Sequence, residues 1–261
     1  MSGRPTAAGP IVTGGPERLF RIGSITAGRT SVTGSMATGP WSAGPDGTPA
    51  AGALGVLVDN VLGYAIQNQR PAGHWSVSTE ISIDFLTQLP IDGSPLFAEG
   101  RVHQSDRLGG MASGQVIDRS GQIVAQCRQR GRFLPGTPGP VPAAAENAPR
   151  TGDLATVIGL SAGQPLAVTA DLGNPLANLH GGVMLSVSEL TGISALRSAN
   201  ATLVTASIHI TYVRPVPVGT RLMFTPTVQH SGRTLGVVQV ISTNEAGNAC
   251  TIATVVAHQP S

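Results

Sequence analysis

The stretch Gly173-Asn174-Pro175-Leu176-Ala177-Asn178-Leu179-His180-Gly181-Gly182 decides how this sequence is interpreted, because a weaker copy of it occurs earlier in the chain. It runs into a segment with helical spacing that carries Glu189. The earlier copy, Thr48-Pro49-Ala50-Ala51-Gly52, runs into a similar segment that carries Asp59. An offset of 130 residues places His180 over Ala50, Gly182 over Gly52 and Glu189 over Asp59. We therefore expect two copies of one domain.

Length and internal order agree with this division. The 261 residues suffice for two ordinary domains, and a Pro/Ala-rich stretch typical of a stiff linker lies near the middle. We expect a flexible tail at residues 1–20, a first domain at 21–133, a linker at 134–150 and a second domain at 151–261.

Each half is expected to contain a short strand, a long helix and then four antiparallel strands, which is an α+β fold. A curled sheet around a central helix buries the apolar stripe of the helix and the concave face of the sheet. The stripe of the second helix consists of smaller side chains than that of the first, which permits close backbone packing.

Composition argues against several classes of protein. No apolar run approaches the ~20 residues of a membrane-spanning helix, and no signal peptide is evident. The net charge of +2, without a basic cluster, gives little support to nucleic-acid binding. The alternating Arg128, Arg130 and Arg132 are interpreted as a solvated strand face, and Cys127 and Cys250 as buried thiols. We expect a cytoplasmic protein with no metal, cofactor, nucleic-acid or membrane partner.

The second copy resembles the hotdog-fold acyl-CoA thioesterases, in particular the phenylacetate-pathway (PaaI-like) and 4-hydroxybenzoyl-CoA thioesterase type. The resemblance rests on Asn174, on His180-Gly181-Gly182 and on the acid nine residues after the His, Glu189. It implies two tandem hotdog domains, each a long central helix wrapped by a curled antiparallel sheet, pairing as an intramolecular pseudo-dimer. It also implies active sites between the halves, where one half supplies a helix N-terminus and the other supplies an acid. Further association into a homo-oligomer of tandem chains is expected on the same basis.

The residue types in the motif suit thioester hydrolysis. A helix N-terminus offers unpaired N–H groups and a partial positive charge, and glycine leaves room for a substrate. We expect the Gly181 N–H to stabilise the oxyanion. Asn174 donates a second hydrogen bond, positions a water or caps the loop, and His180 is expected to order the turn. The acid either attacks directly or activates a water, and the sequence does not choose between these.

Crosswise pairing of the halves gives two unequal sites. Site one combines Asp59 and Ser78 with Asn174, His180 and Gly181. Site two combines Glu189 and Thr205 with Ala50, Ala51 and Gly52, and Gly44 stands where site one has Asn174. Gly182, Gly52, Ser78 and Thr205 are the candidate substrate-binding residues. We predict that site one is active and site two is degenerate; pairing within each half is the alternative.

The expected function is hydrolysis of an acyl-CoA thioester to the free acid and CoA at one competent site. A non-catalytic acyl-CoA-binding protein is the alternative, because Ala50 and Gly44 replace polar residues of the motif. A hydratase or dehydratase is less favoured, because those enzymes carry a catalytic His and an acid on one short motif. The sequence does not separate aromatic from fatty acyl groups.

Overall fold

A computed structural model describes residues 14–136 and 150–260, which form one large antiparallel sheet with helices against it. The strands are β1 (Ile22–Ala27), β2 (Ser31–Ala37), β3 (His74–Phe85), β4 (Pro95–Ser105), β5 (Gly109–Ile117), β6 (Ile123–Pro135), β7 (Leu166–Ala167), β8 (Val204–Tyr212), β9 (Arg221–Ser231), β10 (Leu235–Asn244) and β11 (Ala249–His258). The α-helices are α1 (Gly15–Leu19), α2 (Gly55–Gln67), α3 (Leu154–Ile158) and α4 (Gly181–Arg197). Short 3-10 turns occur at η1 (Pro40–Ser42), η2 (Ala51–Leu54) and η3 (Ala170–Leu172).

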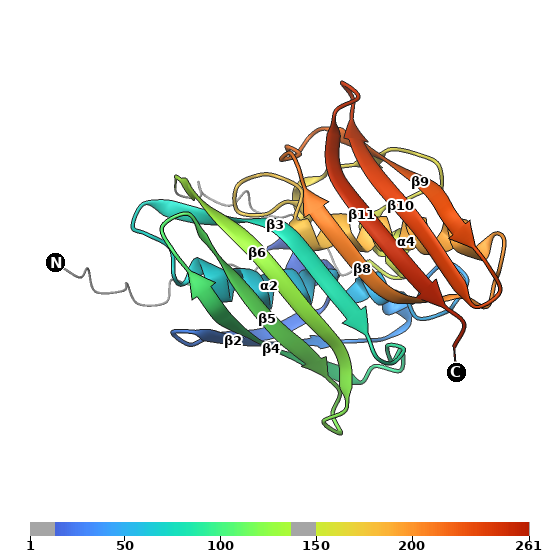
Figure 1. The fold of residues 1–261 in the computed structure, drawn as a ribbon, viewed down its shortest axis with the longest axis horizontal. Helices are drawn as coiled ribbons and strands as arrows, with labels where there is room; N and C mark the ends of the chain where they lie inside the picture. Colours follow the sequence, from blue (N-terminus) through green and yellow to red (C-terminus); the bar gives the residue numbers. More distant parts are fainter. Residues whose placement is uncertain (1–13, 137–149, 261) are drawn as a thin grey trace.

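The order of the strands repeats on the two sides of the sheet. The sheet runs β1-β2-β4-β5-β6-β3-β8-β11-β10-β9-β7, so the pair β3 and β8 joins the two halves of the chain. Outward from this junction, β6, β5, β4 and β2 on one side correspond to β11, β10, β9 and β7 on the other. Figure 1 shows this as a blue-to-green half and a yellow-to-red half, with α2 and α4 each behind its own strands. The repeated order agrees with the order of elements expected from the sequence.

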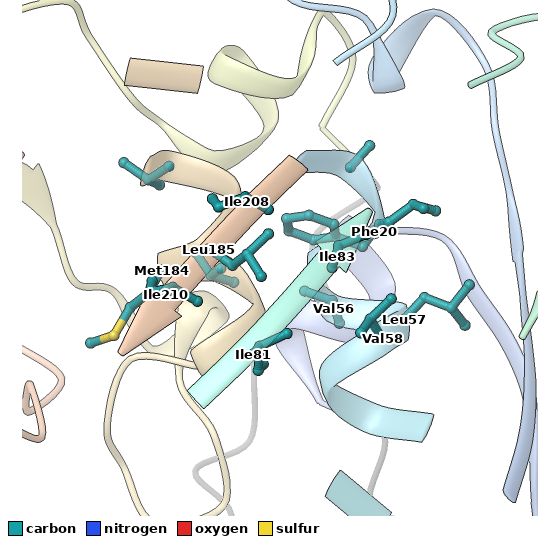
Figure 2. Packing of buried hydrophobic residues seen from close by; sticks show 14 of the residues in the cluster. Phe20, Val56, Leu57, Val58, Ile81, Ile83, Met184, Leu185, Ile208 and Ile210 are labelled. Carbon is teal, nitrogen blue, oxygen red and sulfur yellow. The ribbon is translucent and has the colours of Figure 1, made fainter. Parts of the chain in front are cut away.

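The core lies between this sheet and the helices α2 and α4. At the junction, Ile81 pairs with Ile210 and Ile83 with Ile208, and all four side chains are buried. Figure 2 shows them facing Val56 and Leu57 of α2 and Leu185 of α4, among other apolar side chains. Burying an Ile side chain contributes about 1.5–3 kcal/mol, so this junction ties the two halves into one body.

The two long helices touch through glycine. A Cβ atom on Gly55 would lie 2.2 Å from the carbonyl oxygen of Gly182, and one on Gly182 would lie 2.4 Å from that of Gly55. The Ser186 hydroxyl of α4 donates a hydrogen bond of 2.6 Å to the carbonyl oxygen of Gly52. The small residues predicted to permit close packing therefore set the distance between the helices.

The structure differs from the sequence-based expectation at the N-terminal boundary. Residues 14–20, placed in a flexible tail, include α1 and end at the fully buried Phe20. The Phe20 ring packs edge-on against Trp41, with ring centroids 5.8 Å apart, and this contact anchors the segment. The rest of the predicted tail, residues 1–13, lies outside the described residues.

Two further boundaries are shifted. Strand β6 continues to Pro135, two residues into the expected linker, and residues 137–149 of that linker lie outside the described residues. The short strand expected before the second long helix is confined to β7, because the chain then enters the turn η3 that leads to the motif loop. The interpretations of the arginines and cysteines are confirmed: Arg128, Arg130 and Arg132 are exposed, and both thiols are buried and free.

Candidate active site

The acid of the first half meets the helix start of the second half. Asp59 of α2 is buried, and its Oδ2 accepts a 2.8 Å hydrogen bond from the backbone N–H of Gly182. Its Oδ1 accepts from the Ser78 hydroxyl at 2.7 Å and from the Gln129 side-chain amide at 3.1 Å. All three neighbours donate, which suits an ionised carboxylate, since that group only accepts. The structure thus brings Asp59, Ser78 and the start of α4 together crosswise.

His180 orders the turn that begins α4. As the N-cap residue it accepts a 3.0 Å hydrogen bond at Nδ1 from the N–H of Gly182, and its Nε2 lies 3.1 Å from Asn60 Oδ1. The Asn60 side-chain nitrogen donates to Glu17 at 3.0 Å, so the Asn60 oxygen faces His180 and accepts. The contact with Asn60 calls for a proton on Nε2, and Nδ1 also lies 3.2 Å from Asp59 Oδ2. This arrangement matches the ordering role expected for His180.

Glu17 and Gln129 were missed by sequence reasoning. Glu17 lies in the stretch expected to be a tail, yet its buried carboxylate accepts from Asn60 and from the Gly14 N–H, 3.8 Å from His180 Nε2. Gln129 lies on the buried face of β6, opposite the exposed arginines. A polar residue on the inward side of that alternation was a signal that could have identified Gln129.

Gly181 presents a backbone donor beside the acid. Within residues 14–136 and 150–260, its N–H has no acceptor, whereas its carbonyl oxygen accepts from the Tyr212 hydroxyl at 2.8 Å. Burial, with the charge of Asp59 adding to it, raises the pKa of Tyr212 well above its usual range, so the hydroxyl keeps its proton and donates. A Cβ atom at Gly181 would lie 2.7 Å from Asp59 Oδ2, so only glycine fits without a shift.

Asn174 caps the motif loop. Its side-chain oxygen accepts from the N–H groups of Leu176 at 2.9 Å and Asn178 at 3.2 Å. Of the roles that the sequence leaves open for Asn174, these contacts correspond to capping of the loop. They use the side-chain oxygen and leave the side-chain nitrogen out. A substrate contact by Asn174 stays a prediction.

These groups surround one pocket of about 350 Å³, a size typical of small-molecule sites. Its wall combines residues from both halves of the chain: Glu17, Asp59, Asn60, Gly63, Tyr64, Gln67, Ser78, Gln129, Asn174, His180, Gly181 and Tyr212 are among them. The pocket therefore exposes the acid, the free N–H of Gly181 and the predicted motif residues to a common space.

The second acid, Glu189, has the same kinds of partner as Asp59 but is more deeply buried. Glu189 of α4 accepts from the N–H of Gly52 at 3.0 Å and from the Thr205 hydroxyl, and it is only 1% exposed. Burial raises the pKa of Glu189 above its ordinary value, although both hydrogen bonds oppose the shift. Glu189, Gly52 and Thr205 are thus brought together as predicted, away from the main pocket. Substrate contacts of Gly52, Thr205 and Gly182 stay predictions.

A smaller cavity of about 220 Å³ lies at the equivalent place in the other half. It is lined by Gly44, Pro45, Asp46, Pro49, Ala50, Leu190, Ile193, Ser194 and Arg197, each of which is 130 residues from a residue that lines the main pocket. Arg197, the counterpart of Gln67, lies across it in a 2.8 Å ion pair with Asp46. Glu189 is absent from the lining, so among the described residues this cavity does not reach the second acid.

Comparisons with known proteins identify the activity class. Residues 21–133 match a family model described as the acyl-CoA thioesterase C-terminal domain, and residues 176–251 match one described as the thioesterase superfamily. The protein is a thioester hydrolase. No protein of curated function matches the sequence of this thioesterase.

Solved structures agree with the thioesterase on the fold. A 12:0-ACP thioesterase from Umbellularia californica is 13% identical, with 88% of this chain and 94% of that chain covered and a TM-score of 0.61. The tesB protein of Mycobacterium avium subspecies paratuberculosis is 10% identical, with 93% and 97% covered and a TM-score of 0.62. The acyl-CoA thioesterase II TesB2 from Mycobacterium marinum is 10% identical, with 94% and 97% covered and a TM-score of 0.61. Such identities establish a fold of the hotdog type and nothing narrower.

None of the helices formed by residues 14–136 and 150–260 has the length and hydropathy needed to cross a membrane. The narrower resemblance to the phenylacetate-pathway type stays a prediction, as does association into a homo-oligomer.

Proposed function

We propose that this thioesterase hydrolyses acyl-CoA at one site, formed by Asp59 of the first half and the start of α4 in the second. The observation that carries the proposal is the position of the Asp59 carboxylate, which lines the pocket together with Gly181, whose N–H has no acceptor among the described residues. The match of residues 21–133 to an acyl-CoA thioesterase domain supports CoA as the thiol.

Gln129 favours activation of water over direct attack by the acid. Its side-chain nitrogen donates to Asp59 and Ser78, which leaves its oxygen buried and without a partner among the described residues. A water molecule in the pocket can donate one hydrogen to that oxygen and the other to Asp59. The Ser78 hydroxyl donates to Asp59 and accepts from Gln129, so we assign it to positioning the acid.

The reaction then proceeds in two steps. The water oxygen bonds to the thioester carbon while Asp59 takes its proton, and the carbonyl oxygen becomes an oxyanion facing the Gly181 N–H. The intermediate collapses with cleavage of the carbon–sulfur bond, and the departing CoA thiolate receives the proton from Asp59. The products are the free acid and CoA with its thiol restored.

We propose that the second site is degenerate. Glu189 has the same type of partner as Asp59, but it is only 1% exposed and does not line the smaller cavity. Its turn carries Ala50 where the active site has the N-cap His180, and no side chain caps that turn. We further infer that the halves are tandem hotdog domains arranged as a pseudo-dimer, an inference that the repeated strand order and the paired helices support.

Hydrolysis of a panel of aliphatic and aromatic acyl-CoAs, followed by release of the free thiol, tests the proposal. Asp59→Asn should lower turnover at least ~100-fold, the scale of general-base catalysis. Glu189→Gln, the matched change at the equivalent acid, should retain most of it. The reverse result would exclude the proposed site, and the absence of turnover in the wild type on every acyl-CoA would exclude the proposed function.

A further inference from the structure

Gln67, at the last position of α2, carries a buried hydrogen-bond donor that the fold does not use. The residue is 4% exposed and lines the same pocket as Asp59. Its side-chain oxygen accepts from the backbone N–H of Ser76, which fixes the orientation of the amide, since an N–H requires an acceptor. The Nε2 group therefore faces away from Ser76, and within residues 14–136 and 150–260 it is buried with no partner.

Such a group calls for an explanation, because a buried N–H without an acceptor is unfavourable and rare in folded proteins. The equivalent residue of the other half shows that the fold is able to satisfy this position. There, Arg197 donates to Asp46, to Thr48 and to the carbonyl oxygen of Leu203, all within the protein. The smaller cavity thus has a satisfied donor, and the main pocket has an unsatisfied one.

The placement of Gln67 relates it to the reacting atoms. Asp59, Gly63 and Gln67 lie four residues apart on successive turns of one face of α2, and all three line the pocket. A rise of 1.5 Å per residue puts Gln67 about 12 Å beyond Asp59 along the helix. Gly63 between them adds no side chain of its own, and the Gln129 amide lies 3.3 Å from where its Cβ would be. A substrate held at Asp59 can therefore reach Gln67.

The exposure of the residues that line the pocket indicates which end of the substrate reaches Gln67. Three exposed lining residues, Val213, Arg214 and Pro215, follow Tyr212, and Arg214 is a cation suited to the phosphates of CoA. The fourth, Leu134, pairs with Trp75 on the side of Gln67. Gln67 is among the buried ones. A charged nucleotide stays with the exposed rim, so the uncharged acyl group is the part that extends to Gln67.

We propose that Gln67 is a specificity-determining residue whose side-chain N–H donates to an oxygen atom on the acyl group of the substrate. The enzyme then prefers acyl thioesters that carry a hydroxyl, carbonyl or ether oxygen along the chain over unsubstituted ones. This inference rests on the proposed function, because it takes the thioester to be held at Asp59.

The test compares kcat/KM for hexanoyl-, octanoyl- and decanoyl-CoA with kcat/KM for their ω-hydroxy counterparts. For the chain length that places the hydroxyl at Gln67, the wild type should prefer the hydroxylated substrate at least about tenfold, since a site built to bond a polar group rejects the analogue lacking it. Gln67→Met should abolish the preference while unsubstituted substrates are still hydrolysed. Gln67→Glu, which keeps an oxygen for the Ser76 N–H but has no donor, should do the same. Gln69→Met, the same chemical change outside the pocket, should leave it intact.

Each other outcome overturns the inference. The inference is wrong if the wild type has equal kcat/KM for the unsubstituted and the ω-hydroxy substrate of every pair. It is also wrong if the preference for the hydroxylated substrate survives in both Gln67 variants. Thioesters of N-acetylcysteamine supply a second arm. If the Gln67 variants slow CoA thioesters but not N-acetylcysteamine thioesters, whatever the acyl group, the donor serves the thiol arm instead. Asp59-dependent hydrolysis without any preference refutes only the role of Gln67, whereas no hydrolysis at all refutes the proposed function and this inference with it.

Discussion

The Oδ2 atom of Asp59 lies 2.8 Å from the backbone nitrogen of Gly182, which belongs to the first turn of a helix in the other half of the chain. Glu189 and Gly52 repeat this relationship in the opposite direction, at 3.0 Å. The start of a helix carries a partial positive charge, so each half holds the acid of the other. In the proposed mechanism neither half alone contains a complete site.

Gly181→Ala should separate activity from stability. The equivalent position is Ala51, so the backbone accepts alanine here, but at residue 181 the new Cβ would lie 2.7 Å from Asp59 Oδ2. Displacing the Asp59 carboxylate, which accepts from the neighbouring Gly182 N–H, should lower kcat at least about 100-fold, the scale of general-base catalysis. Thiol release and the thermal midpoint should be measured together. Ala51→Gly is the matched control, and it should leave turnover unchanged; normal turnover by Gly181→Ala would refute the role of this glycine.

Gly182→Ala should instead destabilise the fold. Its Cβ would lie 2.4 Å from the carbonyl oxygen of Gly55, and backbone atoms on both helices would have to move. Overpacking of this kind costs about 1–3 kcal/mol of the free energy of unfolding, which urea denaturation measures. The comparison is Gly63→Ala, also in a helix, where the nearest atom is the flexible end of Gln129 at 3.3 Å. If the two variants lose equal stability, the glycine contact does not set the distance between the helices.

The sequence predicted those parts of the site that lie on a repeated local pattern. Asp59, Glu189 and the two helix starts recur at one offset, so their crosswise pairing could be stated before any coordinates. Glu17 could not be found this way. Glu17 lies in a segment without apolar periodicity, which was expected to be a tail. Its position depends on the packing of Phe20 against Trp41, a residue later in the chain.

Gln129 and Gln67 illustrate a second limit. Strand and helix periodicity place both on buried faces, but periodicity does not tell which polar atoms remain without a partner. That depends on contacts between segments distant in the sequence, such as the one between Gln129 and Asp59. The ion pair between Arg197 and Asp46 in the smaller cavity depends on such a contact too. In contrast, the sequence alone shows that Ala50 stands where the other half has His180.

Glu17→Gln should weaken both the fold and the site. The carboxylate accepts from Asn60 and from the Gly14 N–H, and a glutamine offers only one oxygen, so one donor loses its partner. An unpaired buried donor costs about 1–3 kcal/mol, and denaturant unfolding should show this loss. Because Asn60 orients His180, kcat/KM should fall as well. Glu80→Gln on the sheet surface is the control and should stay within about 0.5 kcal/mol. A Glu17→Gln variant as stable and active as the wild type would contradict the proposed chain of contacts.

Glu189 should make the stability of the protein fall as the pH rises. Burial raises the pKa of Glu189 above the ordinary value of 4.5 that the unfolded chain retains. Between these two pKa values the folded state binds more protons than the unfolded state, so the free energy of unfolding decreases with increasing pH. The stabilising contribution is fully present below about pH 4.5 and is lost as the pH rises through the folded pKa.

Glu189→Gln removes this titration. Its oxygen can still accept from the Gly52 N–H, and its nitrogen can donate to Thr205, so the local hydrogen bonds have substitutes. Urea denaturation across the pH range should show the variant gaining stability relative to the wild type as the pH increases from about 4.5. A difference between the two proteins that stays constant with pH would mean that Glu189 ionises alike in the folded and unfolded chains. Burial of Glu189 would then have no effect on its ionisation.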